Sequence, residues 1–280
     1  MPMTDKQMSR TTSSLICLIA VLAALCVLLS IILLFVKGCN GCADNSNRDT
    51  PADTAADGTG TGSLPVDNPQ TADVVLPATA DAGNAYQDKL VFVGDSLTAH
   101  LISRGVLTDG VNTKQVWRTQ SNMMNLNSEI TNVKVNLPGT GEYVTIAEAA
   151  ERVKPAILVI TLGTDYGVSY LNEQDFKDAY TKLVKAVQEK SPNTKIILQS
   201  IFPVADNCKV LANAKIDTCN TWVKAIAAEN GCRYLDTQSV LKDSRNNLKA
   251  EYCGSDDGIH LTESAYRTIL QYIRTHALTE

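Results

Sequence analysis

The sequence predicts an α/β domain with a parallel central sheet and helices on both faces, preceded by one transmembrane helix and a disordered linker. Residues 15–36 contain no charged side chain, and residues 40–86 carry seven Asp and one Arg without a hydrophobic period. From residue 87 onward, short apolar runs alternate with helical patterns. The predicted parts are a cytoplasmic N-terminus (1–14), a transmembrane helix (15–36), an extracellular linker (37–86) and a folded domain (87–280).

The apolar run at residues 15–36 predicts an uncleaved membrane anchor. Its 22 residues include Ser30 as the one clearly polar side chain, and a helix of this length spans about 33 Å, enough for a bilayer core of about 30 Å. A signal peptide has a shorter apolar run, of about 7 to 15 residues, and here Lys37 follows the run directly. Because Lys6 and Arg10 precede the run, we expect the N-terminus in the cytoplasm and the rest outside.

The formal charge of −5 is unevenly distributed along the chain. Residues 1–37 contribute +2, residues 40–86 contribute −6, and residues 87–280 contribute −1. The acidic stretch is rich in Asp, Thr, Ala, Gly and Pro, so it lacks the apolar surface to fold and is predicted to be a disordered spacer. The near-neutral C-terminal part argues against nucleic-acid binding, which needs a basic face.

The eight cysteines predict a disulfide framework outside the membrane. Cys17 and Cys26 lie within the apolar run and are expected to be inert packing residues, whereas four others lie in the C-terminal third. Those four contain no CxxC pair, which argues against a zinc site. In an oxidising compartment we expect two disulfides among them, with three possible pairings left open. The four are Cys208, Cys219, Cys232 and Cys253.

Short apolar runs that end at glycine or polar residues predict buried parallel strands. Amphipathic segments between them predict helices, and the capping box formed by Thr145 and Glu148 marks the start of one that ends near Val153. Other helical stripes lie within residues 176–187, 222–227 and 266–273. The predicted strands are residues 90–93, 156–162, 195–200 and 233–236, with 115–117 and 133–135 competing for a fifth position.

In a parallel sheet the active crevice lies at the carboxyl ends of the strands, and the first strand ends at a candidate nucleophile. Ser96 follows Gly94-Asp95 and would begin the next helix, where free N–H groups favour a developing anion. The alternative role for Ser96 is that of a helix N-cap.

A serine nucleophile needs a base, and His260 is the best candidate of three histidines. His100 lies one turn after Ser96 and is expected to face away from the crevice, and His276 lies near the chain end. Asp257 precedes His260 by three residues across a glycine turn, a spacing that lets a carboxylate orient the imidazole. The alternative is an ordinary Asp-Gly turn beside a surface histidine.

Three motifs together resemble the SGNH, or GDSL, hydrolases over about residues 88–276: Gly94-Asp95-Ser96-Leu97, the Gly163-Thr164 loop and Asp257-Gly258-Ile259-His260. The resemblance implies a flavodoxin-like three-layer α/β/α fold. It also implies that Ser96 is the nucleophile, His260 the general base and Asp257 its partner, with no metal or cofactor. The oxyanion would be held by the Ser96 N–H, a glycine N–H after the second strand and an asparagine side chain after the third.

The sequence departs from the family pattern at two of these oxyanion positions. The family asparagine falls on Asp165, which when ionised accepts but cannot donate a hydrogen bond; if protonated, it would still donate. The family glycine falls within residues 118–122, which contain no glycine, so a backbone N–H of Ser121 or Asn122 is the expected substitute.

These features predict a membrane-anchored serine esterase with an acylated small molecule or glycan as substrate, most simply an acetylated surface glycan. A glycan O-acetyltransferase with the same triad is one alternative, since water access to the acyl-enzyme separates the two reactions. A non-catalytic glycan-binding or scaffold protein on a decayed hydrolase fold is another, suggested by Asp165.

Overall fold

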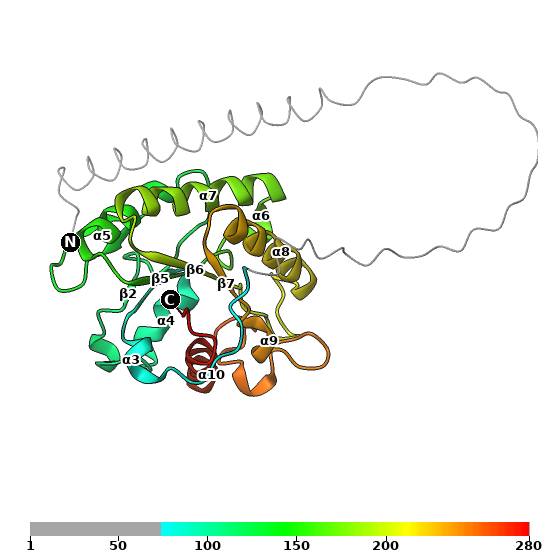
Figure 1. Ribbon diagram of the computed structural model, residues 1–280. Coiled ribbons are helices and arrows are strands. Elements are labelled where there is room, and N and C mark those ends of the chain that lie inside the picture. The colour runs from blue at the N-terminus through cyan, green and yellow to red at the C-terminus, as the bar shows by residue number, and fades with distance from the viewer. Residues whose placement is uncertain (1–73, 280) are drawn as a thin grey trace, which may run out of the picture. The chain divides into compact units, whose positions relative to one another are not determined.

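The computed structural model describes residues 74–279 (Figure 1). The predicted cytoplasmic N-terminus, transmembrane helix and most of the predicted linker lie outside these residues. Among the helices of residues 74–279, none combines the length and the apolar character needed to cross a membrane.

A five-stranded, entirely parallel sheet forms the centre of the domain, in the order β2-β1-β5-β6-β7. This is the doubly wound order of flavodoxin-type folds, so the α/β class with a parallel central sheet is confirmed for the folded domain. The fifth position goes to the run at 115–117, while the competing run at 133–135 forms a separate antiparallel pair, β3 with β4. The strands are β1 Leu90–Gly94, β2 Val116–Trp117, β3 Lys134–Asn136, β4 Tyr143–Thr145, β5 Ile157–Thr161, β6 Lys195–Gln199 and β7 Arg233–Leu235.

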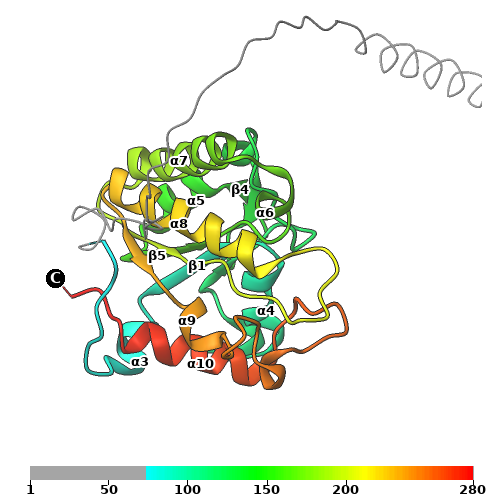
Figure 2. The same ribbon diagram turned by 90° about the vertical axis from the view of Figure 1, so that its right-hand side faces the viewer.

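Helices cover both faces of the sheet, with α5, α7 and α8 on one face and α3, α4, α9 and α10 on the other (Figures 1 and 2). Short helices fill the connections. The α-helices are α3 Gly83–Gln87, α4 Ser96–Ser103, α5 Ile146–Val153, α6 Gly167–Tyr170, α7 Glu173–Lys190, α8 Asn213–Glu229, α9 Gln238–Leu241 and α10 Glu263–Arg274, and the 3₁₀ turns are Gly110–Asn112, Ile130–Asn132 and Ala250–Tyr252.

The helices form where the sequence patterns predict them. Thr145 and Glu148 make the reciprocal capping box at the start of α5. The stripe on α7 buries Phe176, Leu183 and Val187 completely or almost so. Each such side chain contributes about 1.5–3 kcal/mol through removal from water, so these stripes are core faces that hold the helices on the sheet.

The folded part begins earlier than the sequence predicts, because residues 74–86, predicted to belong to the linker, pack against the domain. The Tyr234 N–H of β7 donates to the Val74 carbonyl, and the Leu76 N–H donates to the Tyr234 carbonyl, both at 2.9 Å. Val74 and Leu76 are buried, and the Tyr86 hydroxyl accepts a hydrogen bond from the Leu278 N–H at 2.9 Å. Backbone pairing and apolar burial together order this segment.

The prediction of two disulfides is wrong for the described cysteines, all four of which are free thiols. Cys219 and Cys232 are buried in the core on one face of the sheet, and Cys253 packs against the core on the opposite face. Cys208 lies at the margin of the first core. Burial raises the pKa of Cys219 to about 11 and that of Cys232 to about 12, so both act as small apolar side chains.

Candidate active site

Ser96 stands at the turn from β1 into α4, a turn that requires glycine at position 94. A Cβ on Gly94 would lie 2.1 Å from the Thr161 carbonyl oxygen, so any side chain there would force β1 away from β5. The N-cap of α4 is Asp95, whose Oδ1 accepts from the Leu97 N–H at 3.3 Å. The Ser96 hydroxyl is therefore not used as the helix cap, which was the alternative role for this residue.

Asp95 ties the two strand ends of the site together. Its Oδ2 accepts from the Thr164 N–H at 2.9 Å, which fixes the loop after β5 beside the start of α4. The side chain is fully buried, and burial, followed by the negative charge of Asp165, raises the pKa of Asp95 to about 7. Asp95 is thus a structural clamp that places Asp165 near Ser96.

His260 and Asp257 form a close pair in the loop before α10, with 2.5 Å between His260 Nδ1 and Asp257 Oδ2. Asp257 Oδ1 accepts from the Ser255 hydroxyl at 2.5 Å, the Ile259 N–H at 2.7 Å and the His260 N–H at 3.1 Å. Burial raises the pKa of the Asp257 carboxyl, but these four hydrogen bonds outweigh it and hold that pKa well below its ordinary value. An ionised Asp257 favours the His260 tautomer that carries its proton on Nδ1, which leaves Nε2 as an acceptor.

The loop that carries this pair depends on Gly258. Its φ is +75°, and a Cβ there would lie 2.9 Å from the Cys208 backbone nitrogen. The close approach allows the Ala205 N–H to donate to the Gly258 carbonyl at 2.8 Å, while Asn207 Nδ2 donates to the Asp256 carbonyl at 3.2 Å. The segment before α8 therefore holds the loop that carries Asp257 and His260 in place.

The Asp165 carboxylate accepts hydrogen bonds from backbone and side chain beside Ser96. Its Oδ2 accepts from the Ser96 N–H at 3.3 Å and from the Met124 N–H at 3.0 Å. Its Oδ1 accepts from the Ser96 hydroxyl at 2.9 Å. Two backbone donors thus converge on one oxygen beside the candidate nucleophile, as in an oxyanion hole. Within residues 74–279, Ser96 makes no direct hydrogen bond to His260, because its hydroxyl is engaged by Asp165.

The second backbone donor is Met124, not the residue that the sequence favoured. The N–H of Asn122 donates to the Thr119 carbonyl at 3.3 Å, and its side-chain Oδ1 accepts from Arg118 Nη1 at 2.8 Å. Asn122 has a φ of +64°, so it turns the loop and presents the Met124 N–H instead. A backbone donor has no side-chain signature, so the residue type at position 124 does not predict this role.

Gly163, the other predicted oxyanion-site residue, shapes the loop after β5, and within residues 74–279 its N–H makes no hydrogen bond to the Asp165 carboxylate. Its carbonyl accepts from the Val168 N–H at 2.9 Å. Its φ is +135°, and a Cβ there would lie 2.6 Å from the Ile201 side chain. Gly163 is needed where the loop passes close to Ile201.

The prediction that His100 faces away from the crevice is wrong. The centres of the His100 and His260 rings are 4.8 Å apart, with 31° between the ring planes. A helix places residues four apart on the same face, so His100 shares the face of α4 that carries Ser96. His276, by contrast, stacks on Tyr272 at the end of α10, with 3.7 Å between ring centres.

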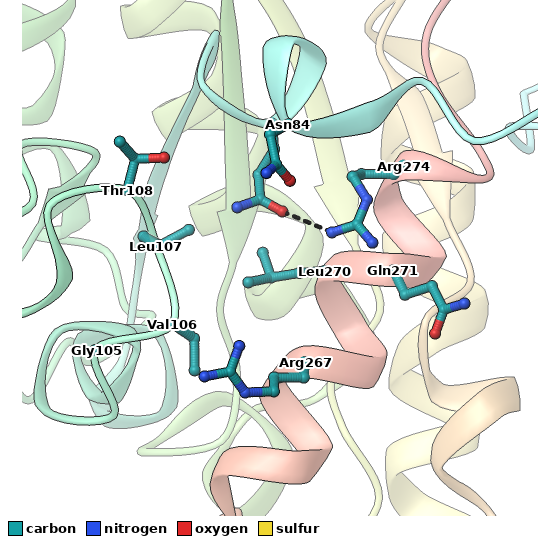
Figure 3. Close-up of a pocket in the computed structure, with 10 residues that line it drawn as sticks. Asn84, Gly105, Val106, Leu107, Thr108, Arg267, Leu270, Gln271 and Arg274 are labelled. Atoms are coloured by element: carbon teal, nitrogen blue, oxygen red, sulfur yellow. Dashed lines mark hydrogen bonds between the residues drawn. The ribbon is translucent and has the colours of Figure 1, made fainter.

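A separate cavity of about 500 Å³ lies between α3, the segment after α4, and α10 (Figure 3). Its two arginines already have partners: Arg267 pairs with Glu263, and Arg274 pairs with Asp81 and donates to Gln87. It shares no lining residue with the Ser96 site. In the described part of the chain, no group of three or more His, Cys, Asp and Glu side chains is arranged to hold a metal ion.

A doubly wound sheet with Ser96 and a His-Asp pair at its carboxyl edge defines the class of an α/β acyl hydrolase. The sequence matches the model of the GDSL-like lipase/acylhydrolase family over residues 92–268, more than half of the chain. The chain therefore belongs to this family, as its three motifs predict. The search of curated proteins gave no match.

Solved structures with a similar arrangement include proteins described as acyl hydrolases. An acylhydrolase from Bacteroides fragilis is 19% identical, with a TM-score of 0.48 over 73% of this chain and 90% of that chain. A GDSL-like lipase from Bacteroides thetaiotaomicron is 16% identical, with a TM-score of 0.46 over 73% and 91%. An acetylxylan esterase from Geobacillus stearothermophilus is 15% identical, with a TM-score of 0.41 over 73% and 98%. These names describe those proteins, and the family assignment depends on the sequence match.

Proposed function

We propose that the protein is a serine esterase that acts outside the membrane and removes acyl groups, in particular acetyl groups, from glycans. The observation that carries the esterase proposal is the convergence of the Ser96 and Met124 N–H groups on one oxygen position beside the Ser96 hydroxyl. Such a position suits the oxygen of a tetrahedral intermediate.

The proposed reaction proceeds through an acyl-enzyme. His260 Nε2 takes the hydroxyl proton of Ser96, and the Ser96 oxygen bonds to the ester carbonyl carbon. The carbonyl oxygen becomes an anion held by the two backbone N–H groups. When the C–O bond to the leaving alcohol breaks, His260 returns the proton to that alcohol. Water, deprotonated by His260, then attacks the acyl carbon, the bond from that carbon to the Ser96 oxygen breaks to release the acid, and His260 returns its proton to the Ser96 oxygen.

Asp165 must leave the oxyanion position before this reaction begins. In the structure its carboxylate fills the place of the carbonyl oxygen and binds the nucleophile's hydroxyl. On this proposal, these hydrogen bonds describe a resting state in which the hole is closed. The same observation favours a second candidate function, a glycan-binding protein in which the closed hole is permanent.

The glycan substrate and the external location rest on sequence features outside the described residues. The apolar run at 15–36 and the acidic spacer after it would hold the domain at some distance from a membrane. Acylated surface polymers are the esters that such a position makes accessible.

The test compares the detergent-solubilised full chain with its Ser96→Ala variant, using p-nitrophenyl acetate and a fluorophosphonate probe. We expect hydrolysis and covalent labelling in the wild type and loss of both in Ser96→Ala. Transfer of acetyl to an added oligosaccharide would identify an acetyltransferase. A folded wild type that neither hydrolyses esters nor is labelled would refute the esterase and leave the binding protein.

A further inference from the structure

One helix carries both the candidate nucleophile and a ring that contacts its candidate base. Ser96 begins α4 and His100 follows it by four residues, about one helical turn. Side chains on a helix lean toward its N-terminus, so the His100 ring leans toward Ser96. The ring lies 4.8 Å from that of His260, which comes from the distant loop before α10.

The surroundings of His100 keep its ring uncharged. Burial lowers the pKa of His100 most, and the proximity of His260 and of the Arg104 guanidinium lowers it further. The carboxylates of Asp257 and Asp165 act in the opposite direction but do not reverse the shift. The Nδ1 atom of His100 is buried and has no hydrogen-bond partner in the described part of the chain. No acidic partner therefore holds this ring in one tautomer, as Asp257 does for His260.

The position of His260 otherwise depends on one side of its ring. Asp257 holds Nδ1 at 2.5 Å, and this hydrogen bond restrains one edge of the imidazole. Nε2 has no hydrogen bond to Ser96 in the closed state. A second contact further restrains the orientation of the ring, and the tilted His100 ring, 4.8 Å away between ring centres, provides one.

We propose that His100 is a positioning residue: its uncharged ring is the surface on α4 against which His260 packs, so that Nε2 faces Ser96 once Asp165 leaves the hole. The position of the base is then set by the same helix that sets the nucleophile. This inference rests on the proposed function, because it assigns to Ser96 and His260 the roles of nucleophile and base.

The variants separate packing from charge and from folding. His100→Phe keeps a flat, uncharged ring, and His100→Ala removes it. His276→Ala removes a histidine that stacks on Tyr272 outside the site and serves as the matched control. Should His100→Ala fail to fold, His100→Leu replaces it, since leucine fills space without a flat face.

We expect His100→Ala to lower kcat about 10- to 100-fold with little change in KM, because a displacement of about 1 Å can reduce a rate 10²-fold. His100→Phe should restore kcat to within about 3-fold of wild type, and His276→Ala should leave kcat unchanged. The proposal would be overturned if folded His100→Ala had the same kcat as wild type. The same holds for His100→Leu where that variant replaces His100→Ala. Equal loss in folded His100→Phe and His100→Ala would also overturn it, since the imidazole itself would then be required.

A second measurement does not depend on turnover. The Nδ1 proton of His260, held between the ring and Asp257, should give a far-downfield NMR resonance that is lost in Asp257→Asn. We expect it to persist in His100→Phe and to broaden in His100→Ala, since the ring would then move and exchange its proton with water. Persistence in both variants would refute the packing role. If the wild type shows the resonance but hydrolyses no ester, the esterase proposal fails. The comparison of the resonance in His100→Phe and His100→Ala still tests whether His100 orients the His260 ring.

Discussion

Replacement of Asp165 by asparagine should make the closed oxyanion hole easier to open, because a neutral amide oxygen accepts weaker hydrogen bonds than a carboxylate. In the wild type the carboxylate accepts three hydrogen bonds, from the Ser96 hydroxyl, the Ser96 N–H and the Met124 N–H. Each hydrogen bond to a charged group contributes about 1.5–3 kcal/mol. A substrate carbonyl that displaces the Asp165 carboxylate forms new hydrogen bonds to the same donors and recovers most of this free energy. If the free energy of one hydrogen bond is not recovered, the reaction is slowed about 10- to 100-fold.

Asparagine also adds a donor. Its amide N–H₂ reaches the position where the carboxylate repels a developing negative charge, and one oxyanion donor is worth about 10²- to 10³-fold in kcat. We expect kcat/KM for p-nitrophenyl acetate to rise at least about 10-fold in Asp165→Asn at pH 7.

The matched control is Asp178→Asn, which removes an exposed carboxylate that accepts from Gln174 on the surface of α7. It should leave kcat/KM unchanged. An Asp165→Asn variant that is folded yet no faster than wild type would refute this account of the hole. In that case Asp165 would contribute to the reaction instead of opposing it.

Two further predictions concern the loop that carries His260. The pKa of Asp257 is lower in the folded state than in the unfolded state, so the stability that this carboxylate contributes is present above its unfolded pKa of about 3.9 and is lost as the pH falls toward the folded value. Between about pH 4 and pH 2, the melting temperature should therefore fall less in Asp257→Asn than in wild type. Equal falls in melting temperature would contradict the hydrogen-bonded role of Asp257. Gly258→Ala combines a φ of +75° with a Cβ 2.9 Å from the Cys208 nitrogen, so urea unfolding should show a destabilisation of about 1–3 kcal/mol. An unchanged free energy of unfolding in Gly258→Ala would mean that the loop relaxes to accommodate the Cβ. Gly83→Ala is the control for backbone strain alone, because Gly83 has a φ of +68° and a Cβ there would meet no atom within 4 Å.

The sheet and the main helices were predictable because their signals are local. The buried runs that became β1, β5 and β6 and the capping box at Thr145 are contained in a few adjacent residues. The short apolar segment Val74-Val75-Leu76 lies within the predicted linker, because the residues around it are mostly polar or small. Its order comes from pairing with β7, a contact across more than 150 residues that no local pattern shows.

The site was predictable where a side chain performs the chemistry and a short turn brings partners together. Asp257 and His260 are three residues apart, and they meet. The spacing of His100 from Ser96 also predicts its position, because residues four apart lie on the same face of a helix. The expectation that His100 faces away from the crevice is inconsistent with this spacing. The Met124 N–H and the entry of Asp165 into the hole depend on how two distant loops meet, which the residue types do not encode.

The pairing of residues 74–76 with β7 also determines where the chain can be shortened. A protein cut at residue 87, the boundary that composition suggests, would leave the N–H and carbonyl of Tyr234 without their partners at Val74 and Leu76. It would also expose a strand edge that can pair with a second molecule. Self-association of such a fragment would then reflect the lost segment and not the native protein, so a soluble form for assay should begin before Val74.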